Sequence, residues 1–251
     1  MQFKCPDVGS TRNWFSNPDR RFCLKIRLEA VTNVEQQAAA ARVRREVFGT
    51  EWAIEVPRID PHDFGRVNQV IARVLPADEV VATVTILDTT GNRTLHEKYE
   101  LAFGRFDRVA RYTHMAVLKP YRGLNLPLYM LLEARQLYVI SGGFTYTWLL
   151  FPADRVMSST FCTTLGFSAS TQVVHGEQGR CRVLLRNEKS HETRVAETQT
   201  RCFLDSIHPK RLQVVQISEA ATAAESVPEF SAGSRWLSYC GLVREDEWVA
   251  H

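Results

Sequence analysis

The stretch YTHMAVLKPYRGLNLPLYMLLEARQLYVISGGFTYTWLLFPADRVMSSTFCTTLGF, from Tyr112 to Phe167, decides the fold of this chain. Its apolar opening, Tyr112–Leu118, predicts a strand, and the turn at Arg122-Gly123 leads into a long amphipathic run that predicts a helix. A second apolar run, Tyr146–Phe151, predicts another strand. A parallel strand–helix–strand unit places its ligand crevice at the strand ends, and the helix N-terminus offers N–H groups to an anionic or carbonyl ligand.

Outward from this stretch, strand and helix patterns alternate. The expected strands cover residues 22–31, 68–75, 79–87, 108–118, 146–151, 173–174 and 181–185, and the expected helices cover residues 34–48, 123–140 and 154–165. Residues 49–66 and 88–107 are polar and rich in turn residues, so we expect loops there. This β-α-β-β-β-α-β-α-β-β order predicts an α/β (α+β) domain over residues 22–187, with a mixed central sheet and helices on both faces.

The two ends of the chain differ from this domain. Residues 1–21 are polar and are expected to form an N-terminal arm. Residues 188–251 form a C-terminal extension, in which residues 201–217 could hold one or two strands. Because its end is rich in aromatic residues, we expect the extension to pack on the core or on a second subunit in a homodimer.

Composition excludes several classes of protein. With 251 residues the chain can bury a sizeable core. No run approaches the about 18–20 apolar residues of a membrane span, and the first residues lack the apolar core of a secretory signal, so we expect a cytoplasmic protein. The six cysteines include no C-x-x-C pair, so neither a metal site nor a disulfide framework is predicted.

The charge is unevenly distributed. The net charge is +3, and the excess of basic residues lies in residues 1–187, whereas the C-terminal extension is mildly acidic. A basic body suits an anionic partner such as a nucleotide or an acidic carrier protein, although ordinary surface charge explains the pattern equally well. A dense Lys/Arg stripe with interleaved aromatic residues is absent from the sequence, which disfavours nucleic acid as a partner.

Pro120, Arg122-Gly123 and the ending Leu165-Gly166-Phe167, in this order of elements, resemble the acyl-donor half of the GNAT acyltransferase superfamily. The resemblance implies the GNAT fold and transfer of an acyl group from a thioester. It implies these donor-binding residues: Met115, Ala116, Val117, Arg122, Gly123, Leu124 and Asn125.

A second set of residues narrows the resemblance. Arg44-x-x-x-Phe48, then Trp52, then Asp60-x-x-Asp63 is similar to the opening of the acyl-homoserine-lactone (autoinducer) synthases and the N-acyl amino acid synthases. These branches also carry an acid-x-x-Arg step before the central strand, of which this chain keeps only Arg111. The acceptor-binding residues implied are Arg111, Thr113, Arg44, Phe48 and Trp52. If the strand alternates regularly, Arg111, Thr113 and Met115 share one face, and Tyr112 and His114 take the other.

Acyl transfer to an amine needs a neutral amine held beside the carbonyl, stabilisation of the oxyanion and a proton for the departing thiolate. The acids that could deprotonate an ammonium, or simply bind it, are Asp60, Asp63, Glu51 and Glu55. The competing interpretation is that Asp60 and Asp63 cap turns in a Pro-rich loop, and that Arg44 is an exposed helix charge. His62 is a weaker candidate than the acids, and His114 is expected to pack in the core.

Cys162 stands where the superfamily often has a tyrosine that protonates the leaving thiolate. A thiol, with an ordinary pKa of about 8.5, could take this role. A small buried cysteine without a catalytic role is the simpler interpretation.

The donor turn departs from the superfamily pattern Arg/Gln-x-x-Gly-x-Gly/Ala, because Asn125 and Pro127 replace both glycines. Pro127 also removes an N–H donor, which weakens a pyrophosphate cradle. Acyl-ACP, which presents only phosphopantetheine, is therefore favoured over acyl-CoA as the co-substrate, and no cofactor is expected to be bound permanently.

Two functional hypotheses follow. The first is an N-acyltransferase that moves an acyl group from acyl-ACP or acyl-CoA to a small-molecule amine such as an amino acid, with a V-shaped cleft between the central strand and Tyr146–Phe151. The alternative is a degenerate GNAT domain that binds an acyl or nucleotide ligand, or a partner protein, without turnover.

Overall fold

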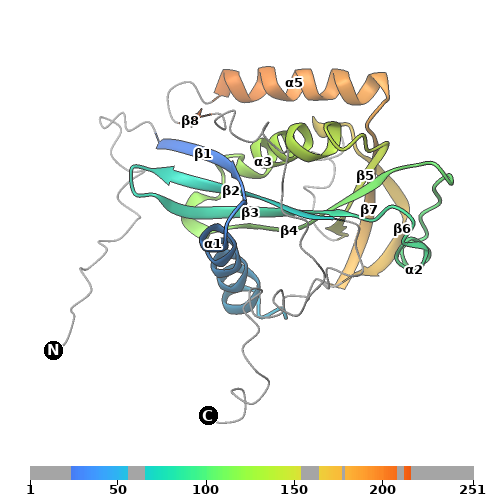
Figure 1. Ribbon diagram of the computed structural model, residues 1–251, viewed down its shortest axis with the longest axis horizontal. Coiled ribbons are helices and arrows are strands. Elements are labelled where there is room, and N and C mark those ends of the chain that lie inside the picture. Colours follow the sequence, from blue (N-terminus) through green and yellow to red (C-terminus); the bar gives the residue numbers. More distant parts are fainter. Residues whose placement is uncertain (1–23, 56–65, 154–163, 177–178, 208–211, 216–251) are drawn as a thin grey trace, which may run out of the picture.

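The computed structural model describes residues 24–55, 66–153, 164–176, 179–207 and 212–215, and all structural statements concern these residues (Figure 1). An eight-stranded sheet in the order β6-β7-β5-β4-β3-β2-β1-β8 forms the centre. Its strands are β1 (Leu24–Ala30), β2 (Val67–Leu75), β3 (Glu79–Asp88), β4 (Val109–Val117), β5 (Tyr146–Pro152), β6 (Ser168–Gly176), β7 (Gly179–Asn187) and β8 (Leu212–Val215).

The sheet is mixed, as the sequence predicts. Among the described strands, β4–β5 and β1–β8 are parallel, and the other neighbouring strands are antiparallel. A parallel pair needs a crossover connection, and the helix between β4 and β5 supplies it.

Helices cover both faces of the sheet (Figure 1). On one face lies α1 (Val34–Arg44), which continues into the π-helical segment η2 (Arg45–Glu51). On the other lie α3 (Leu126–Ala134), continued by the π-helical segment η5 (Arg135–Ile140), and α5 (His191–Ile207). The short elements are α2 (Arg93–Lys98) and the 3₁₀ turn η4 (Lys119–Tyr121).

The core has two parts. The main core lies around β1–β4 and holds buried side chains of α1 and α3, such as Val43 and Leu131. A second cluster lies on β5 and β7 around Trp148, which is fully buried, and Tyr99. In the described residues no helix is both long and apolar enough to cross a membrane. Nor does this part of the chain bring three or more His, Cys, Asp or Glu together as metal ligands.

Two sequence-based expectations were wrong. Residues 88–107 contain a helix, α2, whose N-terminus is capped by Asn92 accepting a hydrogen bond from the backbone N–H of Leu95 at 3.0 Å. The central helix begins at Leu126 instead of Gly123, because Asn125 takes a left-handed conformation (φ +56°) that helical backbone cannot contain. The strand expected within residues 201–217 is present as β8, whereas residues 201–207 belong to α5, a helix that the sequence analysis did not predict. Of the helix expected over residues 154–165, residues 154–163 lie outside the described residues.

Candidate active site

The two parallel strands at the centre pair over only part of their length. Val109–Tyr112 pair with Tyr146–Leu149, and among the described residues the pairing stops there, although β4 continues to Val117 and β5 to Pro152. Backbone groups on a strand edge that lacks a neighbour can hydrogen-bond another extended chain. This is the strand arrangement in which a V-shaped opening is expected.

A β-bulge lies in β4 just beyond that point. Thr85 pairs with Thr113, but Thr83 pairs with Ala116, so β4 contains one extra residue between the two pairs. His114 sits in this bulge with φ +49°, a conformation rare for residues other than glycine. Bulges are frequent next to active sites, where they re-aim side chains.

The bulge overturns the expected alternation of side chains. The register places Arg111 and Thr113 on one face as expected, but Ala116 continues that face in place of Met115. His114 was expected on the face opposite Arg111, yet its ring meets Phe48 of η2, with ring centroids 6.3 Å apart. One extra residue in a strand is enough to cause both changes, because the side-chain period is two.

Arg111 is held in an aromatic setting. Its guanidinium lies 4.9 Å from the ring centroid of Trp148 and 5.5 Å from that of Tyr99, and the residue is 4% exposed. Cation–π contacts of this kind are strongest when the cation is desolvated. The side chain is therefore fixed beside the point where β4 and β5 stop pairing.

His114 is buried near two cations. Burial, and then the positive charges of Arg44 and Arg111, lower the pKa of His114 to about 3. The imidazole is therefore neutral at physiological pH, with one nitrogen donating and the other accepting. The sequence analysis correctly predicted that His114 is buried, but it did not predict that Arg44 and Arg111 lie close to it.

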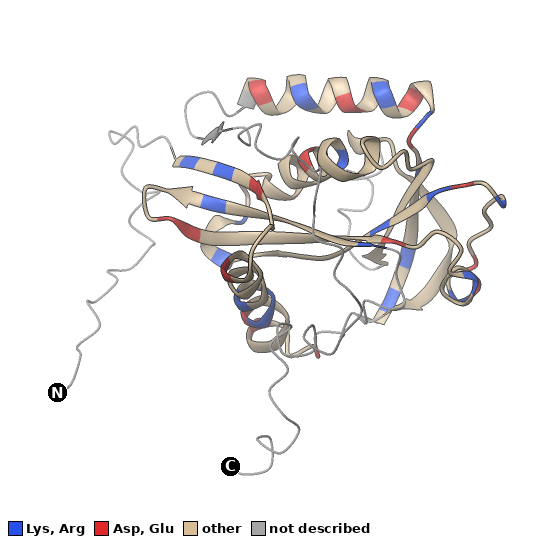
Figure 2. Cartoon of the chain, viewed as in Figure 1, with Lys and Arg blue, Asp and Glu red and all other residues tan. Residues whose placement is uncertain are grey.

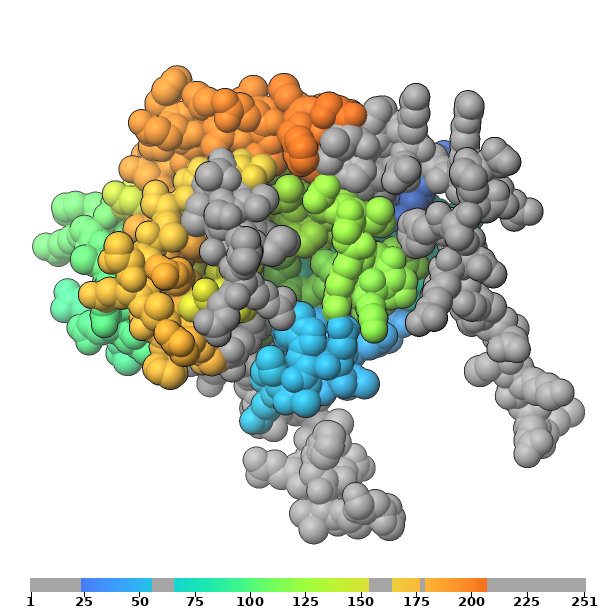
Figure 3. Space-filling model, turned by 180° about the vertical axis from the view of Figure 1, so that it is seen from behind, coloured from blue at the N-terminus to red at the C-terminus, as the bar shows by residue number. Residues whose placement is uncertain are grey.

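An ion pair joins the turn after β4 to η2. Arg122 contacts both carboxylate oxygens of Glu51 at 2.5 and 2.7 Å, and its Nε donates to the carbonyl oxygen of Val117 at 2.9 Å. The hydrogen bond from Arg122 lowers the pKa of Glu51. Figure 3 shows η2 directly beside the α3 segment on this side of the molecule.

Aromatic side chains support this junction. Trp52 packs edge-to-face on Phe48 with centroids 5.4 Å apart, and the guanidinium of Arg122 lies 5.9 Å from the Trp52 ring. Trp52 therefore lies between the expected acceptor and donor residues. Arg44 reaches the same area, because its charge acts on His114.

The other expected site residues divide into three groups. Asp60, Asp63 and Cys162, with His62, lie outside the described residues, so their roles stay predictions. Glu55 is exposed. The remaining residues that were expected to bind the donor lie along β4 and the turn that follows it: Met115, Ala116, Val117, Gly123 (φ +85°), Leu124 and Asn125.

Taken together, the mixed sheet, the crossover helix and the strands that separate beside a β4 bulge are the architecture of the GNAT fold. No protein-family model and no curated protein match the sequence. Among solved structures, FeeM, an N-acyl amino acid synthase from uncultured soil microbes, superposes with a TM-score of 0.52 at 13% identity, covering 70% of this chain and 98% of FeeM. BjaI, a CoA-dependent acyl-homoserine lactone synthase solved with SAM and isopentyl-CoA, gives a TM-score of 0.51 at 14% identity, covering 80% of this chain and 97% of BjaI. At this identity the comparison establishes the fold, which the sequence motifs predicted.

Proposed function

We propose that this protein is a GNAT-type N-acyltransferase, which moves an acyl group from a carrier thioester to an amine acceptor such as an amino acid by direct attack. The observation that carries the proposal is the position of Arg111 and His114, buried on β4 beside the point where its pairing with β5 ends. The activities printed for FeeM and BjaI, an N-acyl amino acid synthase and an acyl-homoserine lactone synthase, add support.

The donor arm would bind along β4. Pantetheine is an extended chain with two amides, and it can add to the separated edge of β4 as a further strand. The edge N–H groups of β4 could also stabilise the oxyanion that forms when the amine attacks the thioester carbon.

The α3 N-terminus favours a carrier-bound donor. Pro127 lies in the first turn and supplies no N–H, the N–H of Leu128 already bonds the Asn125 carbonyl at 3.0 Å, and Arg122 is paired with Glu51. These three features weaken a pyrophosphate site at this helix N-terminus. We therefore propose acyl-ACP as the donor ahead of acyl-CoA.

The acceptor would be held on the α1 side of the sheet. A guanidinium binds a carboxylate bidentately, so Arg111 is the proposed carboxylate ligand of an amino acid acceptor, with Thr113, Arg44, Phe48 and Trp52 around it. Asp60 and Asp63 are the proposed proton acceptors for the ammonium. Glu51 is a weaker candidate because its ion pair keeps it ionised and engaged. Cys162 or water would return a proton to the thiolate.

The test is release of free thiol from matched acyl-ACP and acyl-CoA panels, with and without pooled amino acids and amines. Acceptor-dependent release with acyl-ACP and little with acyl-CoA is the expected result. Release with acyl-CoA alone would leave an ordinary CoA-dependent enzyme and refute the carrier argument.

A variant of Arg111 tests its proposed role as the ligand of the acceptor carboxylate. Arg111→Lys keeps the charge but loses bidentate geometry, so we expect acceptor-dependent turnover to fall about 10- to 100-fold. The control is donor binding by the variant, which should be retained. Full activity of Arg111→Lys would contradict the proposed carboxylate role.

The competing function is a domain that binds its ligand without turnover. The Arg122–Glu51 pair favours it, since the arginine expected to meet the donor already has a carboxylate partner. No thiol release from either panel, together with an acyl or nucleotide ligand that co-purifies, would establish this function instead.

A further inference from the structure

A single buried hydroxyl, that of Thr89, connects three strands of the sheet. Thr89 directly follows β3 and is fully buried. Its hydroxyl donates a hydrogen bond to the carbonyl oxygen of Val109, the first residue of β4, at 3.2 Å. The indole N–H of Trp148 on β5 donates to the same hydroxyl at 3.3 Å. Thr89 therefore ties the end of β3 to the beginning of β4 and to the ring of Trp148.

The same hydroxyl also contacts α2 through His96. The Nε2 atom of His96 lies 3.4 Å from the Thr89 oxygen. Because the one proton of the hydroxyl is donated to Val109, His96 can only act as the donor in this contact, with its proton on Nε2. Burial lowers the pKa of His96 and so favours the neutral ring. Thr89 thus supports α2 as well as Trp148.

Trp148 and the end of α2 enclose the side chain of Arg111. Trp148 is the partner of Arg111 in the register of β4 and β5, and its ring centroid lies 4.9 Å from the guanidinium. Tyr99, which directly follows α2, lies 5.5 Å from the same guanidinium, and its ring packs on that of Trp148 with centroids 5.4 Å apart. A long, flexible arginine side chain loses rotamer freedom between two such rings. Their orientation therefore restricts that of Arg111.

The orientation of the Trp148 ring depends in turn on Thr89. A buried indole N–H needs an acceptor, and in Trp148, which is fully buried, the Thr89 hydroxyl takes this role. Without the hydroxyl, the N–H would stay unsatisfied at a cost in free energy, or the ring would turn towards another acceptor. Either change would alter the surface on which Arg111 rests.

We propose that Thr89 is a positioning residue, which fixes Arg111 through the ring of Trp148, and that α2 completes this support with His96 and Tyr99. The proposal rests on the proposed function, in which Arg111 binds the acceptor, and it names residues outside the acceptor site on which the geometry of that site depends. A displacement of about 1 Å can cost about 100-fold in rate, so support of this kind can affect turnover.

The discriminating pair of variants is Thr89→Val, which removes the hydroxyl and keeps the shape, and Thr89→Ser, which keeps the hydroxyl. We expect Thr89→Val to raise the KM for the acceptor about 5- to 10-fold without changing the KM for the donor, and Thr89→Ser to restore the acceptor KM. The control is Thr200→Val on α5, whose buried hydroxyl donates to the carbonyl oxygen of Ala196 at 2.8 Å. It should lower the melting temperature and leave both KM values unchanged.

A second variant removes the donor of the same hydrogen bond. Trp148→Phe keeps an aromatic ring beside Arg111 but has no N–H, so the acceptor KM should rise as in Thr89→Val. This variant decides the question if Thr89→Val does not fold. A wild-type acceptor KM in either folded variant would overturn the proposal.

The orientation of Arg111 can also be followed by NMR, without turnover. The Nε–Hε resonance of Arg111, assigned by its absence in Arg111→Lys, should be shifted by the ring currents of Trp148 and Tyr99. We expect Thr89→Val to move or split this resonance, whereas Thr89→Ser and Thr200→Val leave it in place. An unchanged resonance in Thr89→Val would overturn the proposal.

The resonance and the thiol assay together separate this proposal from the proposed function. If the resonance depends on Thr89 but the wild type releases no thiol from any thioester, the support of Arg111 is retained and the enzyme is refuted. Acceptor-dependent thiol release with the same acceptor KM in the wild type and in Thr89→Val would retain the enzyme and refute the positioning role.

Discussion

His114 shows what a single inserted residue does to a strand. The residue occupies a left-handed conformation that costs energy for any side chain with a Cβ. The neighbouring strand β3, which pairs with Thr113 and Ala116 on either side of it, and the ring of Phe48 surround it. Backbone strain of this kind gathers at functional sites, which agrees with the position of His114 beside Arg111.

The burial of His114 predicts a specific pH dependence of stability. Its pKa is lowered from 6.5 to about 3, so between these values the unfolded chain binds a proton that the folded protein does not. The free energy of unfolding therefore falls as the pH drops from 6.5 towards 3, by up to about 1.4 kcal/mol per pH unit from this group. Glu51 and Glu192, whose pKa values are lowered, add losses of the same sign at acid pH.

We expect His114→Asn to flatten this dependence. Asparagine tolerates the left-handed conformation but does not titrate, so chemical unfolding at a series of pH values should lose the His114 component and keep that of the carboxylates. The control is His175→Asn, because the His175 side chain is exposed on β6. An unchanged pH profile for His114→Asn would mean that His114 is not held neutral in the folded protein.

Most of the order of elements was predictable, because the strands are apolar runs bounded by turn residues and α1 is rich in helix-forming residues. Two helices, α2 and α5, were not predicted. α2 is six residues long, too short to show a helical period. The buried positions of α5, at Thr193, Ala196, Thr200 and Leu204, have helical spacing, but two are threonines and one is alanine, so the apolar pattern is weak.

The candidate site was only partly predictable. Motif resemblance pointed to Arg122 and the segment around Phe48, which meet at Trp52. It also pointed to Arg111, whose charge acts on His114 beside Phe48. The partners could not be predicted: Glu51 and Arg122 are 71 residues apart in sequence, and nothing in the local pattern shows an ion pair across two elements. The bulge at His114 could not be predicted either, because the sequence of residues 108–118 has the pattern of a regular strand.

The Arg122–Glu51 pair connects η2 to the donor turn, and this predicts the effect of Glu51→Gln. Loss of the carboxylate frees Arg122 for the phosphate of the donor, so the donor KM should fall a few-fold, the modest size expected for a pair that is about one-third exposed. kcat should change little. A fall in kcat of about 100-fold or more would instead identify Glu51 as the general base. Glu46→Gln is the control, because Glu46 is exposed in the same π-helical segment and has no proposed role.

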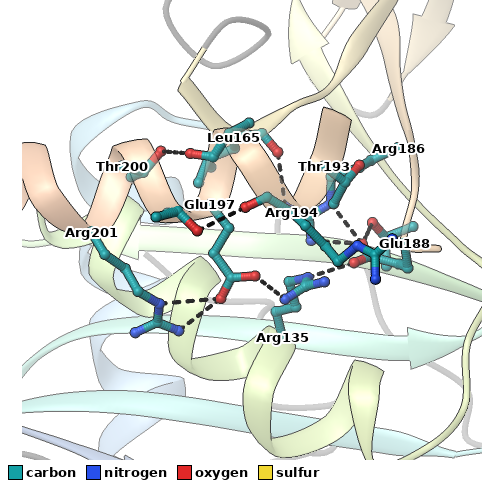
Figure 4. A network of polar contacts seen from close by, with 12 residues as sticks. Arg135, Leu165, Arg186, Glu188, Thr193, Arg194, Glu197, Thr200 and Arg201 are labelled. Carbon is teal, nitrogen blue, oxygen red and sulfur yellow. Dashed lines mark hydrogen bonds and ion pairs between the residues drawn. The ribbon is translucent and has the colours of Figure 1, made fainter. Parts of the chain in front are cut away.

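At the scale of the whole molecule, a buried network of charges joins the sheet to the helices of the α3 side (Figure 4). Glu188, at the end of β7, accepts hydrogen bonds from Arg135 of η5 at 2.6 Å and from Arg186 of β7 at 2.7 Å, and also from Thr147 of β5. Arg135 pairs in addition with Glu197 of α5. Basic and acidic residues alternate along α5 (Figure 2), and of these Glu197 and Arg201 take part in the network.

The ion pair between Arg135 and Glu197 links α5 to this network. The Arg186 side chain is 1% exposed and that of Glu188 is 3% exposed, so neither charge could be solvated if its partner were lost. Arg201 of α5 also pairs with Glu197, at 2.9 Å, but its side chain is 41% exposed. Substitution of Glu188 should therefore lower the stability far more than substitution of Arg201.

We expect Glu188→Ala to lower the free energy of unfolding by about 3–5 kcal/mol, since it leaves the guanidiniums of Arg135 and Arg186 buried without their shared carboxylate. Arg201→Ala, the matched control on the same network, should lower it by no more than about 1 kcal/mol, because its partner Glu197 keeps Arg135 and water can replace the exposed guanidinium. Urea unfolding followed by circular dichroism measures both. Equal, small losses would show that the network contributes little to stability and that apolar packing, such as that of Leu204 in the main core, holds α5 in place.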